Sequence, residues 1–174
     1  MARNVEIKAR VHDFEAFYAR AQKLCDGQEP TILEQFDTFF KSTNGRLKLR
    51  QFQGTTSTPA ELIYYDRPDS EGPKLSEFVK VRVDDAQNLE KALELAMGTR
   101  GTVTKKRFLF LYGQTRIHLD RVEGLGDFME LEVTLKADET PEYGQEVADG
   151  LMKDLGIEEK DLIKGAYIDK LIEA

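Results

Sequence analysis

The sequence predicts an α+β domain with an eight-stranded antiparallel sheet, and two observations lead to this prediction. Charged and apolar residues alternate along most segments, which is the periodicity of a β-strand with one polar and one apolar face. Hairpin and turn signals join these segments, including Asn44-Gly45 and the break at residues 124–126. Short connections of this kind favour antiparallel pairing, and eight strands are enough to close a barrel.

The first half of the chain reads as strand, helix and four strands. Residues 4–11 alternate as a strand, and apolar residues at helical spacing over 14–24 predict a helix that ends near Gly27. Residues 31–40 and 46–50 flank the Asn44-Gly45 turn. A polar loop over 54–59 precedes a strand at 61–65, and residues 67–69 end that strand. The turn at Gly72-Pro73 leads into a strand over 74–83.

The second half reads as helix, three strands and terminal helices. An amphipathic helix carries apolar residues at 89, 93 and 96 and ends at Gly98. Strands follow at 102–111 and on both sides of the break within 116–133. Thr140-Pro141 is typical of a helix start, and this helix runs to Gly156 before a short last helix around Tyr167. Residues 1–174 are therefore expected to form one domain.

Composition limits the classes of function. The 174 residues are 40% hydrophobic and carry a formal net charge of −7, which argues against a nucleic-acid binder held by overall charge. No apolar run is long enough to span a bilayer and the first residues lack a signal-peptide core, so we expect a cytoplasmic protein without a membrane partner. A single cysteine, Cys25, excludes intrachain disulfides and a cysteine-based zinc site. No feature decides whether the chain forms a homodimer.

The charges on the alternating faces are sorted by sign. The bases on these faces, with Arg67 near a strand end, are Lys8, Arg10, Arg46, Lys48, Arg50, Arg67, Lys80, Arg82, Lys105, Arg107 and Arg116. The acids in equivalent positions are fewer, namely Glu6, Asp37, Asp120, Glu130 and Glu132. Each face could simply point to water, or hold cross-strand ion pairs. If the faces point into a closed barrel, the cationic excess requires a polyanion, and the carboxylates suit Mg²⁺ or Mn²⁺.

Several spaced motifs resemble the CYTH superfamily, the triphosphate tunnel metalloenzymes, which includes class IV adenylyl cyclases and thiamine triphosphatases. The motifs lie at residues 5–8, 45–50, 105–107, 118–120, 124–128 and 130–132, so the resemblance covers essentially the whole chain. It implies a closed eight-stranded tunnel with flanking helices, a bound small-molecule triphosphate and a divalent metal. One departure from the family pattern is Asn4, which stands where its Glu-x-Glu-x-Lys motif has the first glutamate.

The resemblance also implies roles for individual residues. Metal contacts are expected from Glu6, Asp120, Glu130 and Glu132. Phosphate contacts are expected from Lys8, Arg10, Arg46, Lys48, Arg50, Lys105, Arg107 and Arg116, with Arg67 and Arg82 added to them. Glu6, Lys8 and Glu130 are the expected catalytic residues.

Three functions follow from these expectations. The first is a metal-dependent hydrolase of triphosphates, with inorganic triphosphate the simplest substrate because it needs only lumen residues. Thiamine triphosphate and nucleoside triphosphates stay open as substrates, although each would also need a pocket for its organic end. The second is a cyclase that converts ATP to cyclic AMP and pyrophosphate; Tyr64, Tyr65 and Phe78 are its candidate stacking residues, although aromatic residues on strands are more often core. The third is a non-catalytic triphosphate binder. His118 shares the face of Arg116 and Asp120, where a phosphate contact and a structural role are both open.

Overall fold

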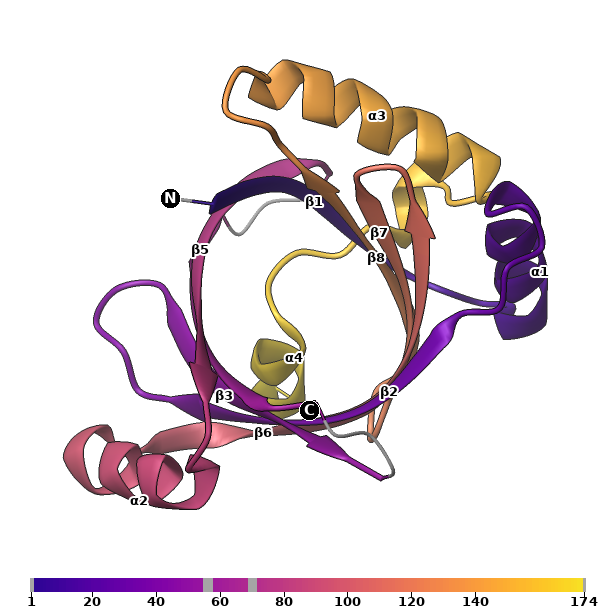
Figure 1. Cartoon of the computed structure of the whole chain (residues 1–174). Helices are drawn as coiled ribbons and strands as arrows, with labels where there is room; N and C mark the ends of the chain where they lie inside the picture. Colours follow the sequence, from indigo (N-terminus) through magenta and orange to yellow (C-terminus); the bar gives the residue numbers. More distant parts are fainter. Residues whose placement is uncertain (1, 55–57, 69–71, 174) are drawn as a thin grey trace.

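A closed β-barrel with helices around its outside forms the body of the protein (Figure 1). The computed structural model describes residues 2–54, 58–68 and 72–173. The strands are β1 (Ala2–Arg10), β2 (Thr31–Phe40), β3 (Arg46–Gln53), β4 (Ala60–Asp66), β5 (Lys74–Val83), β6 (Thr99–Tyr112), β7 (Thr115–Val122) and β8 (Gly126–Thr134). The helices are α1 (Phe14–Leu24), α2 (Ala86–Met97), α3 (Pro141–Asp154), the 3-10 helix η1 (Glu159–Asp161) and α4 (Tyr167–Glu173).

The barrel closes through β1, which pairs with β5 on one side and β8 on the other. The strand order around the barrel is β1-β5-β4-β3-β2-β6-β7-β8, and every neighbouring pair is antiparallel. The β1–β8 register places Ile7 opposite Leu131, which joins the first strand of the chain to the last. The predicted eight-stranded antiparallel closed barrel with flanking helices is confirmed.

The main hydrophobic core lies outside the barrel, between its outer face and the helices. Val5 and Ile7 of β1 and Leu131 of β8 are fully buried, and they belong to one apolar cluster with Phe17 of α1 and Leu151 of α3. Because side chains alternate along a strand, residues between these positions point into the barrel. The charged faces are therefore the inner faces, and the alternative that they point to water is wrong for the centre of the barrel.

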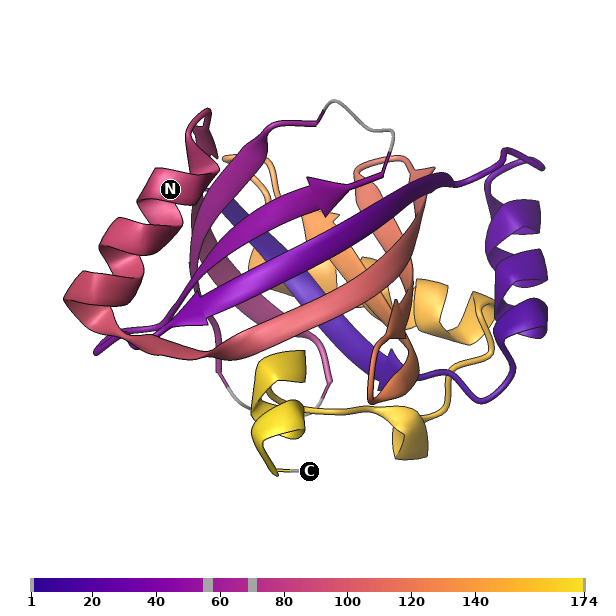
Figure 2. The ribbon, with the colours of Figure 1, turned by 90° about the horizontal axis from the view of Figure 1, so that it is seen from below.

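A second apolar cluster fills one end of the barrel beneath α4. Figure 2 shows α4 lying across this end, away from the mouth that faces the viewer in Figure 1. Phe39, Tyr65, Phe128 and Tyr167 are all at most 9% exposed in this cluster. The barrel is thus closed by side chains at the α4 end, and a cavity remains in the interior of the barrel.

The structure refines several expected boundaries. The strand predicted to begin at residue 102 begins at Thr99, and η1 had no counterpart in the predictions. Residues 55–57 of the predicted loop over 54–59, and Asp69 in the predicted strand end, fall outside the described residues. Within the described residues, no helix has the length and apolar character needed to cross a membrane.

Two glycines of α3 provide a test of the outer core. A Cβ on Gly144 would lie 2.5 Å from Cγ2 of Val5, whereas a Cβ on Gly150 would meet nothing within 4 Å. We expect Gly144→Ala to lower the free energy of unfolding by about 1–3 kcal/mol through overpacking. Gly150→Ala, the matched control, should raise it by up to about 1 kcal/mol because alanine favours the helix. Urea unfolding measures both, and equal effects at the two sites would contradict the packing of α3 on β1.

Candidate functional site

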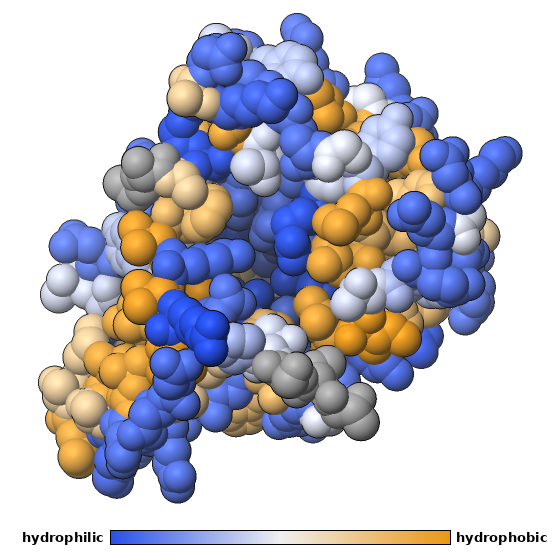
Figure 3. Space-filling view, viewed as in Figure 1, coloured by the Kyte–Doolittle hydropathy of each residue, from blue (hydrophilic) through white to orange (hydrophobic). Residues whose placement is uncertain are grey.

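The inner faces of the strands line one cavity with both signs of charge. Its basic side chains are Lys8, Lys48, Arg50, Arg67, Lys80, Lys105 and Arg107. Its acidic side chains are Glu6, Asp37, Glu130 and Glu132. Figure 3 shows a hydrophilic hollow on the face opposite α4. Positive charge is therefore in excess inside a protein whose net charge is −7, which suits an anion of several charges.

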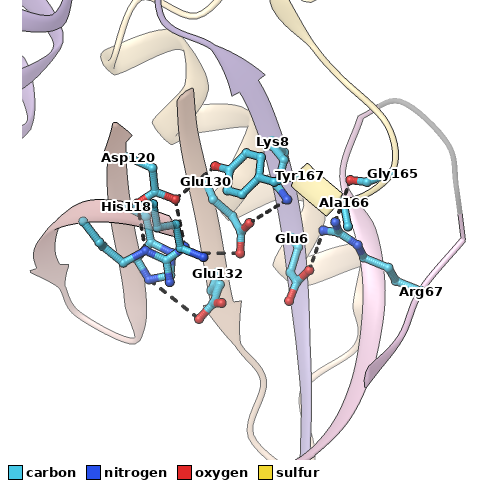
Figure 4. A network of polar contacts seen from close by, with 12 residues as sticks. Glu6, Lys8, Arg67, His118, Asp120, Glu130, Glu132, Gly165, Ala166 and Tyr167 are labelled. Atoms are coloured by element: carbon cyan, nitrogen blue, oxygen red, sulfur yellow. Dashed lines mark hydrogen bonds and ion pairs between the residues drawn. The ribbon is translucent and has the colours of Figure 1, made fainter. Parts of the chain in front are cut away.

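Three carboxylates gather on two neighbouring strands. In the β1–β8 register, Glu6 lies opposite Glu132 and Lys8 lies opposite Glu130. His118 of β7 lies opposite Glu130 on the other side of β8. One donor atom each from His118, Glu130 and Glu132 fall within 4.8 Å of one another (Figure 4).

Mutual repulsion among these carboxylates favours a positive counter-charge. Burial, and then the charge of Glu130, raises the pKa of Glu6 to about 7. Burial and Glu130 also raise the pKa of Glu132. Burial also favours a higher pKa for Glu130. The ammonium of Lys8, 3.3 Å away, and other positive groups outweigh burial and hold the pKa of Glu130 well below its usual value. Glu130 and Glu132 thus offer oxygen ligands that fit a divalent cation. Glu6 is instead paired with Arg67, so its predicted metal contact stays a prediction.

Asp120 lies apart from this carboxylate group. Its two oxygens accept hydrogen bonds from Nε and Nη2 of Arg107, both at 2.8 Å, and Oδ2 also accepts one from the hydroxyl of Tyr167 at 3.0 Å. Burial opposes ionisation, but Arg107 lowers the pKa of Asp120 to about 2. The role of Asp120 as a metal ligand stays a prediction, and the observed contacts make it a support for Arg107.

Asp37 organises the opposite wall, although its role was not expected. It accepts a bidentate pair from Arg50 at 2.8 Å and contacts Nζ of Lys105 at 3.1 Å and Nζ of Lys48 at 3.5 Å. Burial favours its neutral form, but Arg50 and then Lys105 hold the pKa of Asp37 well below the usual value. The only sequence signal was its place on the inner face of the strand, because the three partners come from β3 and β6.

Other predicted residues divide between the cavity and its surroundings. Arg67 lines the cavity and donates to Glu6 and to the carbonyl of Gly165, both at 2.8 Å. The predicted phosphate contacts that do not line the cavity are Arg10, Arg46, Arg82 and Arg116. Arg46 pairs with Asp169 of α4 at 2.7 Å, and the side chain of Arg82 is 73% exposed. Their roles stay predictions, and the cavity adds Lys80, one of the bases on the alternating faces.

The aromatic residues of the cavity lie under cations. Nζ of Lys8 lies 4.0 Å from the ring centroid of Tyr167, and Nζ of Lys48 lies 5.0 Å from that of Tyr65. Tyr64 alternates with Tyr65 and does not line the cavity. Nζ of Lys80 lies 5.5 Å from the ring centroid of Phe78. Each of these three rings therefore already has an ammonium group within cation–π range.

Comparisons with known proteins agree with this geometry. A family model described as the CYTH domain matches residues 2–167. A Methanocaldococcus jannaschii protein named "putative adenylate cyclase" is 23% identical over 173 residues, which cover 95% of this chain and 96% of that protein. A Pyrococcus horikoshii structure superposes with a TM-score of 0.81 at 25% identity, covering 95% of this chain and 98% of that chain. A Hippeastrum "putative adenylyl cyclase", described as having a dominant triphosphatase activity, superposes at 0.66 with 17% identity over 98% of this chain and 95% of that chain.

Asp37→Asn tests the ion-pair wall. Removing one partner leaves Arg50 and two lysines buried without their counter-charge, so we expect the free energy of unfolding to fall by about 3–5 kcal/mol. Asp84→Asn is the matched control, because the Asp84 side chain is 85% exposed in its pair with Arg82 and should change stability by less than about 0.5 kcal/mol. Chemical denaturation measures both variants. Equal stability of Asp37→Asn and the parent protein would contradict this role of Asp37.

Proposed function

The chain belongs to the CYTH family, and from this premise we propose that it is a divalent-metal-dependent hydrolase of triphosphates with inorganic triphosphate as its substrate. The observation that carries the proposal is the buried cavity in which seven basic side chains face four carboxylates. Inorganic triphosphate needs only such polar contacts, whereas a nucleoside triphosphate also needs a surface for its base. The proposal takes residues 1–174 as one domain acting in the cytoplasm on a small molecule, with Mg²⁺ or Mn²⁺ as the cofactor.

Binding is assigned to the two walls of the cavity. Arg50, Lys105 and Lys48 on one wall, with Arg107 beside them, would contact the phosphate oxygens, since arginine can bind them in a bidentate manner and lysine supplies point charges. Glu130 and Glu132 on the other wall would hold the cation, which supplies Lewis-acid polarisation of phosphate oxygens. The substrate would thus lie between the cationic wall and the carboxylate group.

Hydrolysis then requires an oriented water. Glu6 has a pKa of about 7, which is in the range of a general base near neutral pH. Its carboxylate is fixed by Arg67 at 2.8 Å, so it can take a proton from the water that attacks the terminal phosphorus. The bond from that phosphorus to the bridging oxygen breaks, and orthophosphate and pyrophosphate leave. Lys8 and Arg67 lie on the same wall and would stabilise the developing negative charge.

The first test is a product analysis. We would incubate the protein with Mg²⁺ or Mn²⁺ and, separately, inorganic triphosphate, ATP and thiamine triphosphate, and resolve the products by chromatography. Orthophosphate and pyrophosphate from inorganic triphosphate are expected. Glu130→Gln should lower kcat by about 100-fold or more because it removes a buried charge from the carboxylate group. The matched control Glu146→Gln, exposed on α3, should behave as the parent.

Two other product patterns would replace this proposal. Cyclic AMP and pyrophosphate from ATP, without hydrolysis of inorganic triphosphate, would establish the cyclase. Tight binding of triphosphate without any turnover would establish a non-catalytic binder.

The pH dependence should report the buried lysines. Burial lowers the pKa of Lys105 to about 8, with Asp37 opposing the shift, and burial and then Arg67 lower the pKa of Lys8 to about 8. Burial and then Arg50 also lower the pKa of Lys48, the third lysine assigned to phosphate binding. Because each of these lysines loses its charge as the pH rises, kcat/KM for inorganic triphosphate should fall above pH ~8 with a logarithmic slope of about −2 or steeper. In Lys105→Arg the fall should be less steep by about one unit of slope, because arginine stays charged. An unchanged slope in the variant would contradict a role for the Lys105 charge.

A further inference from the structure

The imidazole of His118 is buried without a hydrogen-bond partner. His118 is 1% exposed, and neither Nδ1 nor Nε2 has a hydrogen bond to any described residue. Two carboxylate oxygens lie near it: Oε1 of Glu130 is 3.9 Å from Nδ1 and Oε2 of Glu132 is 4.0 Å from Nε2. The guanidinium charges of Arg107 and Arg116 also act on the ring. On its other side the register places Leu109, which offers no side-chain partner. Leaving a buried polar group unsatisfied destabilises a fold, so this arrangement requires an explanation.

The separations do not suit a histidine held by ion pairs. An imidazolium between two carboxylates would form charge-assisted hydrogen bonds of about 2.7–2.9 Å. The observed separations of 3.9 Å and 4.0 Å are longer than such bonds. A neutral imidazole has a free lone pair on one nitrogen. One ring nitrogen of His118 and one oxygen each of Glu130 and Glu132 lie within 4.8 Å of one another. Ligands of one ion lie up to about 4.4 Å apart, because metal–ligand distances for nitrogen and oxygen are about 2.0–2.2 Å, so a small inward shift brings all three onto one ion.

We propose that His118 supplies a nitrogen ligand to the divalent cation held by Glu130 and Glu132, and that this ligand makes the site favour Mn²⁺ over Mg²⁺. The inference rests on the metal site of the proposed function and adds a residue and a selectivity to it. Mg²⁺ prefers oxygen ligands and keeps much of its water shell, whereas imidazole suits transition-metal ions and Mn²⁺ accepts both donor types. The strands enforce the mixed set, since His118 and Glu130 are directly opposite in the β7–β8 register.

Electron paramagnetic resonance of bound Mn²⁺ tests the ligation directly. The chain has two histidines, and His12 lies elsewhere, with Nε2 paired to Asp161 at 2.8 Å and its side chain 66% exposed. In His12→Gln, His118 is therefore the only imidazole. We expect the spin-echo modulation of bound Mn²⁺ to carry a ¹⁴N coupling of directly bound imidazole, which changes to the ¹⁵N pattern when histidine is labelled. Bound Mn²⁺ without this coupling, or no Mn²⁺ binding at all, would overturn the inference.

Metal affinities provide a second measurement. His118→Phe keeps an aromatic ring of similar size and removes both nitrogens. We expect its Mn²⁺ affinity to fall on the order of tenfold or more, with a smaller loss for Mg²⁺, by titration calorimetry without substrate. Equal losses for the two ions would contradict the proposed selectivity. If His118→Phe fails to fold, the labelled His12→Gln protein still decides the question.

Turnover of inorganic triphosphate separates this inference from the proposed function. Hydrolysis by a protein whose Mn²⁺ shows no histidine coupling would overturn the role of His118 alone. Histidine coupling in a protein that releases no orthophosphate would leave the ligand assignment intact and overturn the hydrolase.

Discussion

The burial of charge inside a closed barrel is the constraint on which the rest of the structure depends. Inside a protein a charge without a partner is very costly, and one with excellent geometry is tolerated. The barrel meets this requirement with two bidentate pairs, Arg50 with Asp37 and Arg107 with Asp120, all 2.8 Å long. Each arginine lies directly opposite its aspartate in the register of neighbouring strands. Strand pairing and ion pairing therefore fix one another, and a register slip would leave four charges buried without partners.

These pairs also explain how the basic side chains can be neutralised in part by carboxylates and still have N–H groups left for a bound anion. The two aspartates are used by the arginines, while Lys48 and Lys105 share Asp37 with Arg50. Several N–H groups therefore remain for phosphate oxygens. The other carboxylates repel one another across β1 and β8, and a cation would relieve that repulsion. Under the proposed function, the same barrel would thus separate the wall that binds the anion from the wall that holds the cation.

The sequence was informative about periodicity and less so about partners. Strand alternation and the turns predicted the eight strands, but closure depends on pairing between residues such as Ile7 and Leu131, which are far apart in the chain. Alternation placed His118 and Asp120 on one face, but it could not predict which of the two side chains lies beside Glu130. The answer depends on Arg107, which lies opposite Asp120 and occupies both oxygens of its carboxylate. Arg82 has the right alternation but lies near the end of its strand, where the side chain reaches solvent.

The closed end of the barrel links the helix α4 to the charges in the cavity. Tyr167 is 4% exposed; its hydroxyl donates to Asp120, and its ring lies under Nζ of Lys8. The segment before α4 also accepts a hydrogen bond from Arg67 through Gly165. Because α4 and its apolar cluster fill this end, the charged walls are open at the opposite mouth, where the hydrophilic hollow lies. The proposed triphosphate would therefore enter from that mouth and meet charged side chains before the aromatic residues at the closed end.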